Sequence, residues 1–169
     1  LKTFVFDNGP AMFVGVLPDS TVAAPPGEEF ILKTDKAMHI YNARMQSYLG
    51  FSDSVTAGIL PAQAKLFALL PARIQGLALE SPKTDYDPGE IVTLDIKTLP
   101  DTLKAVTLAV RIELLKDGKP VEPYTKKLAV KGAASHHIPL ALNQAKGEYS
   151  VRLTEIISGQ RTEMKFEVR

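Results

Sequence analysis

The three histidines are the first side chains to consider for metal or acid–base chemistry. His136 and His137 are adjacent on a predicted strand, where successive side chains point to opposite faces, so the pair is poorly placed to hold one metal ion. The pattern predicts one ring inside and one in solvent. His39 lies beside Ile40 and Tyr41 in an apolar strand, which favours a hydrogen-bonded or edge histidine. A Gly-x-Ser-x-Gly motif is missing, and the lack of Cys excludes thiolate catalysis and Cys-ligated zinc.

An acidic segment, Asp-Tyr-Asp-Pro-Gly-Glu from Asp85 to Glu90, is the one oxygen-rich run that resembles a calcium loop. An EF-hand needs a bidentate Glu at its twelfth position, and that position, counted from Asp85, holds Ile96. Pro88 and Gly89 are typical of a turn before a strand. We therefore predict a turn, with Tyr86 covering the end of a core. A weak surface calcium site is the alternative.

Aromatic side chains are the remaining candidates for ligand contact. Sugar-binding surfaces favour flat rings, above all Trp, and the chain contains no Trp. Tyr41, Tyr48 and Phe51 form the candidate carbohydrate or partner contact, with packing in a core or between modules as the competing interpretation. The acidic residues are scattered, and no phosphate-binding or dinucleotide motif is present. We assign no catalytic, cofactor-binding or metal-binding residue, and we expect a protein that is not an enzyme and has no cofactor.

Composition narrows the classes of partner. The 169 residues are 45% hydrophobic and 23% charged, which is typical of a globular protein. Lys and Arg number 20 against 19 Asp and Glu, a net charge of +1 without charged blocks, so we expect no nucleic-acid partner. No run approaches the ~20 apolar residues of a membrane helix, so we expect no membrane insertion. The chain opens at Leu1 without a signal peptide, which suggests an excised piece or a processed product.

The elements that must position these residues are predicted to be strands, because 12 Pro and 11 Gly separate short apolar runs. A hairpin around Asn8-Gly9 joins the first two strands, and Ser20–Gly27 is a predicted loop. Ala62–Leu70 contains good helix formers, but it is short, lacks a cap and lies between prolines, so a strand is favoured. The strands expected in this first half are Lys2–Asp7, Ala11–Leu17, Glu29–Lys33, Met38–Tyr41, Ser47–Leu49, Ser54–Thr56 and Ala62–Leu70.

The second half predicts seven more strands: Gly76–Leu79, Ile91–Ile96, Val106–Leu114, Tyr124–Val130, His136–Leu142, Gly147–Ile156 and Glu163–Val168. Seven strands in roughly 95 residues are typical of an immunoglobulin-like sandwich, here without its Cys pair and core Trp. Alternation of apolar residues predicts a core that includes Val106, Val110, Ile112, Val151 and Leu153. The fold class is therefore all-β, with two antiparallel β-sandwich modules, 1–74 and 75–169, divided near Ala72–Gln75. The short linker suggests that the modules pack together.

The first module contains four short motifs and an opening hairpin, Phe4–Leu17: Met38-His-Ile-Tyr-Asn42, Ser47-Tyr-Leu-Gly50, Leu60-Pro61 and Lys65-Leu-Phe-Ala-Leu-Leu-Pro71. In these motifs it resembles the C-terminal antiparallel β-domain of large bacterial glycoside-hydrolase-like proteins with a β-galactosidase-type catalytic barrel. Residues 81–96, with Tyr-x-Pro-Gly-Glu before a strand, are similar to macroglobulin-like or fibronectin-like modules.

This resemblance implies an accessory role, because the catalytic carboxylates of such proteins lie on an upstream barrel. We expect a non-catalytic region of a secreted, periplasmic or cell-surface bacterial protein that braces or orients a carbohydrate-active domain. Its expected partner is the upstream catalytic domain of the parent chain. A module that binds polysaccharide or a partner protein is the alternative, and a hydrolase with an unrecognised site is a third.

Overall fold

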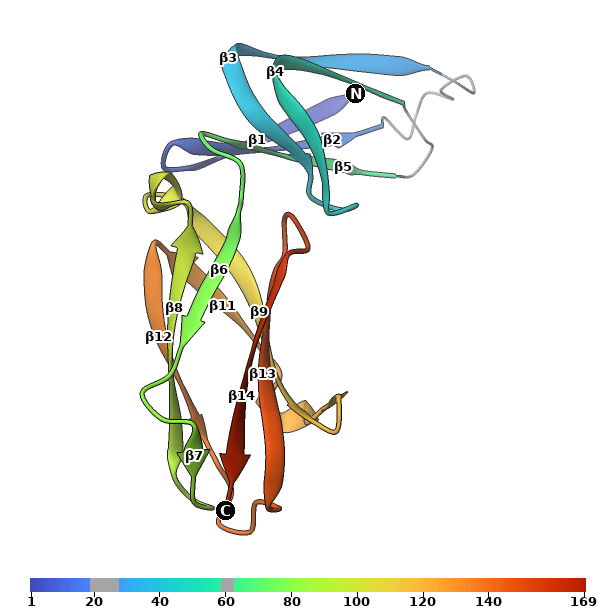
Figure 1. Cartoon of the computed structure of the whole chain (residues 1–169). Helices are drawn as coiled ribbons and strands as arrows, with labels where there is room; N and C mark the ends of the chain where they lie inside the picture. Colours follow the sequence, from blue (N-terminus) through green and yellow to red (C-terminus); the bar gives the residue numbers. More distant parts are fainter. Residues whose placement is uncertain (19–27, 59–62) are drawn as a thin grey trace. The chain divides into compact units, whose positions relative to one another are not determined.

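The computed structural model describes residues 1–18, 28–58 and 63–169, and every regular element longer than one turn in that part of the chain is a strand (Figure 1). The all-β prediction is confirmed. The chain divides into two compact units, Leu1–Arg73 and Ile74–Arg169, whereas the predicted division falls one residue later. The predicted loop Ser20–Gly27 and the Leu60-Pro61 motif lie outside the described residues. Among the described residues, no helix is long and apolar enough to cross a membrane.

Unit 1 is one five-stranded sheet in the order β1-β2-β5-β3-β4. A two-residue turn joins the first two strands, and Gly9, at a φ of 63°, adopts the left-handed conformation that such a turn requires. The predicted hairpin is therefore confirmed. The strands are β1 (Lys2–Asn8), β2 (Ala11–Leu17), β3 (Glu29–Asn42), β4 (Ser47–Gly58) and β5 (Lys65–Leu70).

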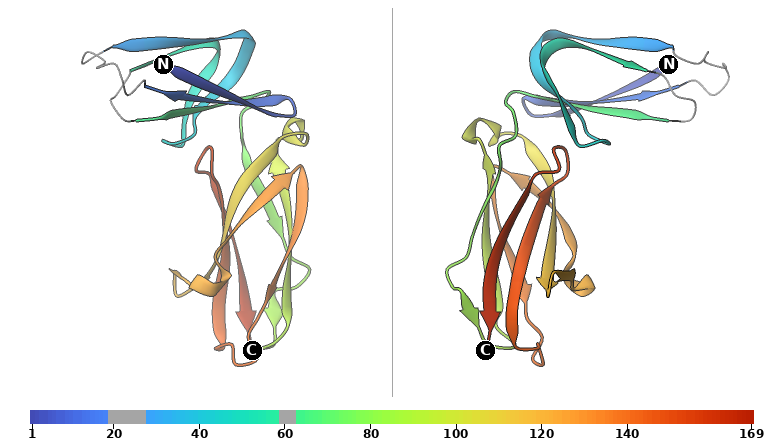
Figure 2. Two further views of the ribbon diagram at one scale, coloured as in Figure 1. Left: turned by 180° about the vertical axis from the view of Figure 1, so that it is seen from behind. Right: turned by 45° about the vertical axis from the view of Figure 1, so that its right-hand side comes forward.

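Two long strands replace four short ones that the sequence predicts. β3 spans both Glu29–Lys33 and Met38–Tyr41, and β4 spans both predicted segments opposite. The β3–β4 ladder shifts register between Lys33 and Met38, where a break is expected, and between Ile40 and Tyr41, inside a predicted strand. Such irregularities bend strands without ending them. Figure 2 shows the bent β3–β4 pair folding over the rest of the sheet.

The bend encloses the core of unit 1. The strand prediction for Ala62–Leu70 is confirmed over its described part, since β5 pairs with both β2 and β3. Side chains on both faces of β5 are buried, since Phe67, Ala68, Leu69 and Leu70 are all 1% exposed or less. The core consists of Val14, Val16, Met38, Ile40, Phe67 and Leu69, with Met12, Phe30, Leu32, Val55 and Ala57 packed against it.

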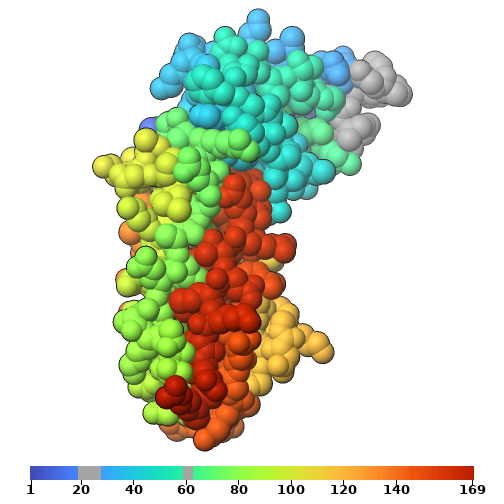
Figure 3. All heavy atoms as spheres, viewed as in Figure 1, coloured from blue at the N-terminus to red at the C-terminus, as the bar shows by residue number. Residues whose placement is uncertain are grey.

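Unit 2 contains all seven predicted strands and two short additional ones, β7 and β10. β7 runs parallel to β14, and the other pairs are antiparallel. In the space-filling view the segment around β6 and β7 lies along β14 (Figure 3). The strands are β6 (Gly76–Glu80), β7 (Asp85–Tyr86), β8 (Ile91–Leu99), β9 (Thr107–Lys116), β10 (Lys119–Pro120), β11 (Lys126–Lys131), β12 (Ala133–Pro139), β13 (Gly147–Glu155) and β14 (Arg161–Val168).

These strands form the predicted sandwich. The pairing path is nearly interrupted between β11 and β12, which share only the pair of Lys131 with Ala133. One layer is β6-β8-β12 and the other is β11-β9-β13-β14-β7, and their inner faces enclose one core (Figure 2). The five predicted core residues, Val106, Val110, Ile112, Val151 and Leu153, are all fully buried.

Candidate functional site

Four aromatic side chains from β3 and β4 gather on one face of unit 1, and we call them the ring cluster: His39, Tyr41, Tyr48 and Phe51. The ring centroids of His39 and Phe51 are 4.8 Å apart, and those of His39 and Tyr48 are 5.9 Å apart. The Tyr41 and Tyr48 centroids are 5.1 Å apart. The rings therefore form a continuous series of contacts, Phe51 to His39 to Tyr48 to Tyr41.

A β-bulge brings these rings to the same face. Tyr48 and Phe51 are three residues apart, so a regular strand would place them on opposite faces. The register instead pairs Phe51 with His39 and Tyr48 with Tyr41, which leaves one additional residue on β4 between the two pairs. Gly50, at a φ of 127°, supplies the unusual backbone conformation at this point.

Exposure differs strongly across the three residues predicted to contact a ligand. Tyr41 is only 2% exposed, Tyr48 is half-buried and Phe51 is 62% exposed. Tyr41 therefore supports Tyr48 from the protein side, and Phe51 presents its ring to solvent. The structure brings the three together as a group, and their contact with carbohydrate or a partner stays a prediction.

His39 and Arg73 hold Tyr48 in place. The Nδ1 atom of His39 lies 2.9 Å from the Tyr48 hydroxyl, which confirms a hydrogen-bonded histidine. The Arg73 guanidinium lies 4.6 Å from the Tyr48 ring centroid, in a cation–π arrangement. Burial and, to a smaller extent, the positive charge of Arg73 lower the pKa of His39. Sequence reasoning missed Arg73, because nothing around it in the sequence indicates a ring 25 positions earlier.

The acidic segment forms the turn that the sequence predicts. The Glu90 N–H donates to the Asp87 carbonyl at 3.0 Å, and Gly89, with a φ of 86°, follows Pro88 at the bend. This is the geometry of a type II turn. Tyr86 is buried in the core of unit 2, and its hydroxyl lies 2.6 Å from Ser81 Oγ. The expected covering role of Tyr86 is confirmed.

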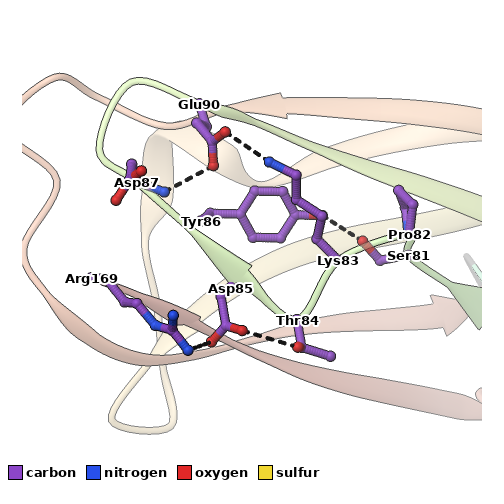
Figure 4. Close-up of a pocket in the computed structure, with 9 residues that line it drawn as sticks. All are labelled: Ser81, Pro82, Lys83, Thr84, Asp85, Tyr86, Asp87, Glu90 and Arg169. Atoms are coloured by element: carbon purple, nitrogen blue, oxygen red, sulfur yellow. Dashed lines mark hydrogen bonds and ion pairs between the residues drawn. The ribbon is translucent and has the colours of Figure 1, made fainter.

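The carboxylates around this turn line a shallow surface pocket (Figure 4). Lys83 extends past the Tyr86 ring, and its Nζ lies 2.8 Å from Glu90 Oε1. The other Glu90 oxygen accepts the Asp87 N–H at 2.9 Å. These two hydrogen bonds, that of Lys83 first, lower the pKa of Glu90. Asp85 pairs with Arg169 at 2.9 Å, so two of the three acids face cations of the protein itself.

The described residues contain no group of three or more His, Asp or Glu side chains placed to hold a metal ion. His136 is half-buried, while His137 is exposed and lies 3.3 Å from Thr93 Oγ1. The prediction that these two rings occupy different faces of β12 is confirmed. Burial is the first cause, and the Lys126 charge the second, of a lowered pKa of His136.

Comparisons with known proteins find distant, partial likeness to β-rich structures. No protein-family model matches the chain, and no curated protein sequence matches it. A β-glucosidase from Listeria innocua in complex with isofagomine is similar over 54% of this chain and 16% of its own, at 17% identity and a TM-score of 0.38. The adhesin InvE of Yersinia pseudotuberculosis is similar over 96% of this chain and 55% of its own, at 12% identity and a TM-score of 0.46. The PmoD soluble domain from a Methylocystis species is similar over 55% and 89%, at 19% identity and a TM-score of 0.35.

Proposed function

We propose that this chain is a non-catalytic accessory region of a secreted, periplasmic or cell-surface carbohydrate-active protein, which it serves by bracing or orienting a catalytic domain. The sequence resemblance of residues 1–75 to the C-terminal β-domain of glycoside-hydrolase-like proteins supports this proposal. The two all-β units, each with its own core, are suited to a spacer.

The observation that carries the proposal is the exposed ring of Phe51 in the ring cluster. A phenyl ring that is 62% exposed is held in place by the His39 ring, which in turn contacts Tyr48. The bulge turns Tyr48 and Phe51 toward the same face of the sheet, and reorienting a side chain is a recurrent role of β-bulges. The proposal interprets this exposed, supported ring as the point of contact with the domain that is braced.

A glycosidase panel on the isolated chain tests the non-catalytic part of the proposal. We expect no turnover of any aryl glycoside or oligosaccharide in the panel. Turnover that disappears when one particular Asp or Glu is replaced by its amide would refute the proposal, because it would place a catalytic acid in this chain.

The ring cluster also favours a second function, a module that binds polysaccharide directly. Affinity electrophoresis in gels that contain neutral or acidic polysaccharides separates the two functions. Retardation that is lost in Phe51→Ala would support the binding module. Ile31→Ala is the matched control, since Ile31 is an apolar residue of β3 with a similar exposure of 60%. Migration that no polysaccharide alters would favour the bracing role.

A further inference from the structure

Strand β1 is an edge strand that is exposed on both faces. It ends the sheet of unit 1, and among the described strands it pairs only with β2. Phe4 is 44% exposed, Val5 56% and Phe6 59%, although Val5 points to one face and the two phenylalanines point to the other. Unprotected edges with apolar side chains are templates for pairing with another strand.

The opposite edge of the same sheet, β4, is protected in ways that β1 is not. The β3–β4 ladder shifts register twice, and β4 presents a polar stretch, Ser52–Ser54. Bulges and polar residues discourage edge-to-edge pairing. In contrast, β1 pairs with β2 in unbroken register over its whole length, from Lys2 opposite Leu17 to Asn8 opposite Ala11. β1 therefore has no bulge in its pairing with β2, and its free edge is suited to pair with another strand.

The hairpin turn determines which backbone groups of β1 point outward. In a two-residue hairpin the residues that flank the turn, here Asn8 and Ala11, form a hydrogen-bonded pair, and such pairs alternate along the ladder. Phe6 and Phe4 are therefore also bonded to β2. The N–H and C=O groups of Thr3, Val5 and Asp7 point away from β2, toward the open edge.

We propose that β1 pairs antiparallel with β1 of a second copy of this chain, about a twofold axis at Val5. In this register Thr3 lies opposite Asp7 of the second copy, and Val5 lies opposite Val5. Their backbone N–H and C=O groups, which point away from β2, can then form hydrogen bonds between the two copies. Phe4 then lies opposite Phe6 of the second copy at a non-hydrogen-bonded position, where cross-strand side chains are closest. The pairing joins two sheets into one and goes beyond the accessory role.

The side chains of β1 are complementary to themselves in this register. Lys2 lies opposite Asn8 of the second copy, and Asp7 lies opposite Thr3, so no like charges meet. Within each copy, Phe6 of β1 lies opposite Phe13 of β2, and Phe4 lies opposite Gly15. Phe13, Phe6 and Phe4 of the second copy therefore form a row across three adjacent strands. The twofold axis generates a second, equivalent row. Aromatic cross-strand pairs of this kind stabilise sheets.

Sedimentation equilibrium of the 169-residue chain and two double variants tests both the dimer and its register. Phe4→Lys/Phe6→Lys places lysines opposite each other at both positions, and we expect its dissociation constant to rise at least about tenfold. Phe4→Lys/Phe6→Glu also replaces both rings by charged side chains but places Lys opposite Glu twice, and we expect dimerisation to be retained. We expect both variants to fold, because the replaced side chains are exposed. Circular dichroism and melting curves check this.

Three outcomes would overturn the proposal. A wild-type chain that stays monomeric at millimolar concentration excludes the pairing. Equal dimerisation of the two double variants would show that Phe4 and Phe6 do not face each other. A dimer that Leu142→Lys disrupts and the β1 variants leave intact would assign the interface to unit 2, where Leu142 is 89% exposed.

Discussion

The two units of this chain enclose their cores in different ways. In unit 2 two layers face each other, and side chains from both, such as Leu94 on β8 and Ile112 on β9, are fully buried. In unit 1 a single sheet bends over itself, and its edge strand β1 is left exposed on both faces. Many of the side chains around the unit 1 core, such as Phe30 and Val55, are only partly buried.

This difference predicts where the chain is most stable and where it makes contacts. Local stability follows burial of apolar surface, so unit 2 should unfold at the higher free energy. Unit 1 contains the supported ring of Phe51 and the open edge of β1, both of which present apolar side chains to solvent. The same incomplete enclosure that is expected to lower the stability of unit 1 also leaves these apolar side chains exposed.

The largest expected effect is the loss of a side chain from the closed core. Ile112→Ala removes a fully buried side chain at the centre of β9 and should lower the free energy of unfolding of unit 2 by about 2–5 kcal/mol. Urea denaturation followed by circular dichroism measures the change. The matched variant Ile31→Ala removes the same atoms from an exposed position of unit 1, and its effect should stay below about 0.5 kcal/mol. Equal effects would contradict the contrast between the units.

The next effect concerns a buried carboxylate that organises the β13–β14 turn. Glu155 is fully buried, its Oε1 accepts the Ile157 N–H at 2.9 Å, and its Oε2 accepts the Ser158 N–H at 2.7 Å and the Ser158 hydroxyl at 2.6 Å. Glu155→Ala leaves these donors without their acceptor and should destabilise unit 2 by about 2–3 kcal/mol.

Ser158→Ala is the matched control for this turn. It removes the hydroxyl, which also accepts the Gln160 N–H at 3.3 Å, and keeps both backbone hydrogen bonds to Glu155, so a loss of about 0.5–1.5 kcal/mol is expected. Thermal melts of both variants beside the wild type measure the difference. Two variants of equal stability would mean that the hydrogen bonds of the carboxylate to the two backbone N–H groups add nothing to what the serine hydroxyl contributes.

Alternation of apolar residues predicted unit 2 well and unit 1 in part, for a physical reason. Each strand of a two-layer sandwich buries one face, so the core positions of β9 and β13 follow directly from a period of two. A bulge depends on which residues lie opposite on the neighbouring strand, and the sequence of β4 alone does not contain that information. The alignment of Tyr48 with Phe51, and the contact of Arg73 with Tyr48, therefore could not be predicted locally.

A smaller effect sharpens the description of the ring cluster. Arg73→Gln removes the positive charge beside His39, so the pKa of His39 should rise toward, without reaching, its ordinary value, because burial is the larger cause of its lowering. Titration of the His39 ring protons by NMR measures this shift. Since the lowered pKa favours the neutral ring in the folded state, the contribution of His39 to stability is present above pH 6.5 and is lost as the pH falls through the folded pKa. An unchanged titration in Arg73→Gln would refute an effect of the Arg73 charge on the pKa of His39.

The smallest expected effect is that of calcium on the turn from Asp85 to Glu90. Pro88 and Gly89 fix the bend, Glu90 is engaged by Lys83 and the Asp87 N–H, and Asp85 is engaged by Arg169. An ion would have to displace these cations to gather the three carboxylates, so melting curves in millimolar calcium and in chelator should superimpose. A bound ion would instead stabilise the fold by about 2.7 kcal/mol at a hundred times its dissociation constant. An upward shift of the melting temperature by several degrees that Asp87→Asn abolishes would show that this segment binds calcium. The stability of unit 2 would then depend on a ligand.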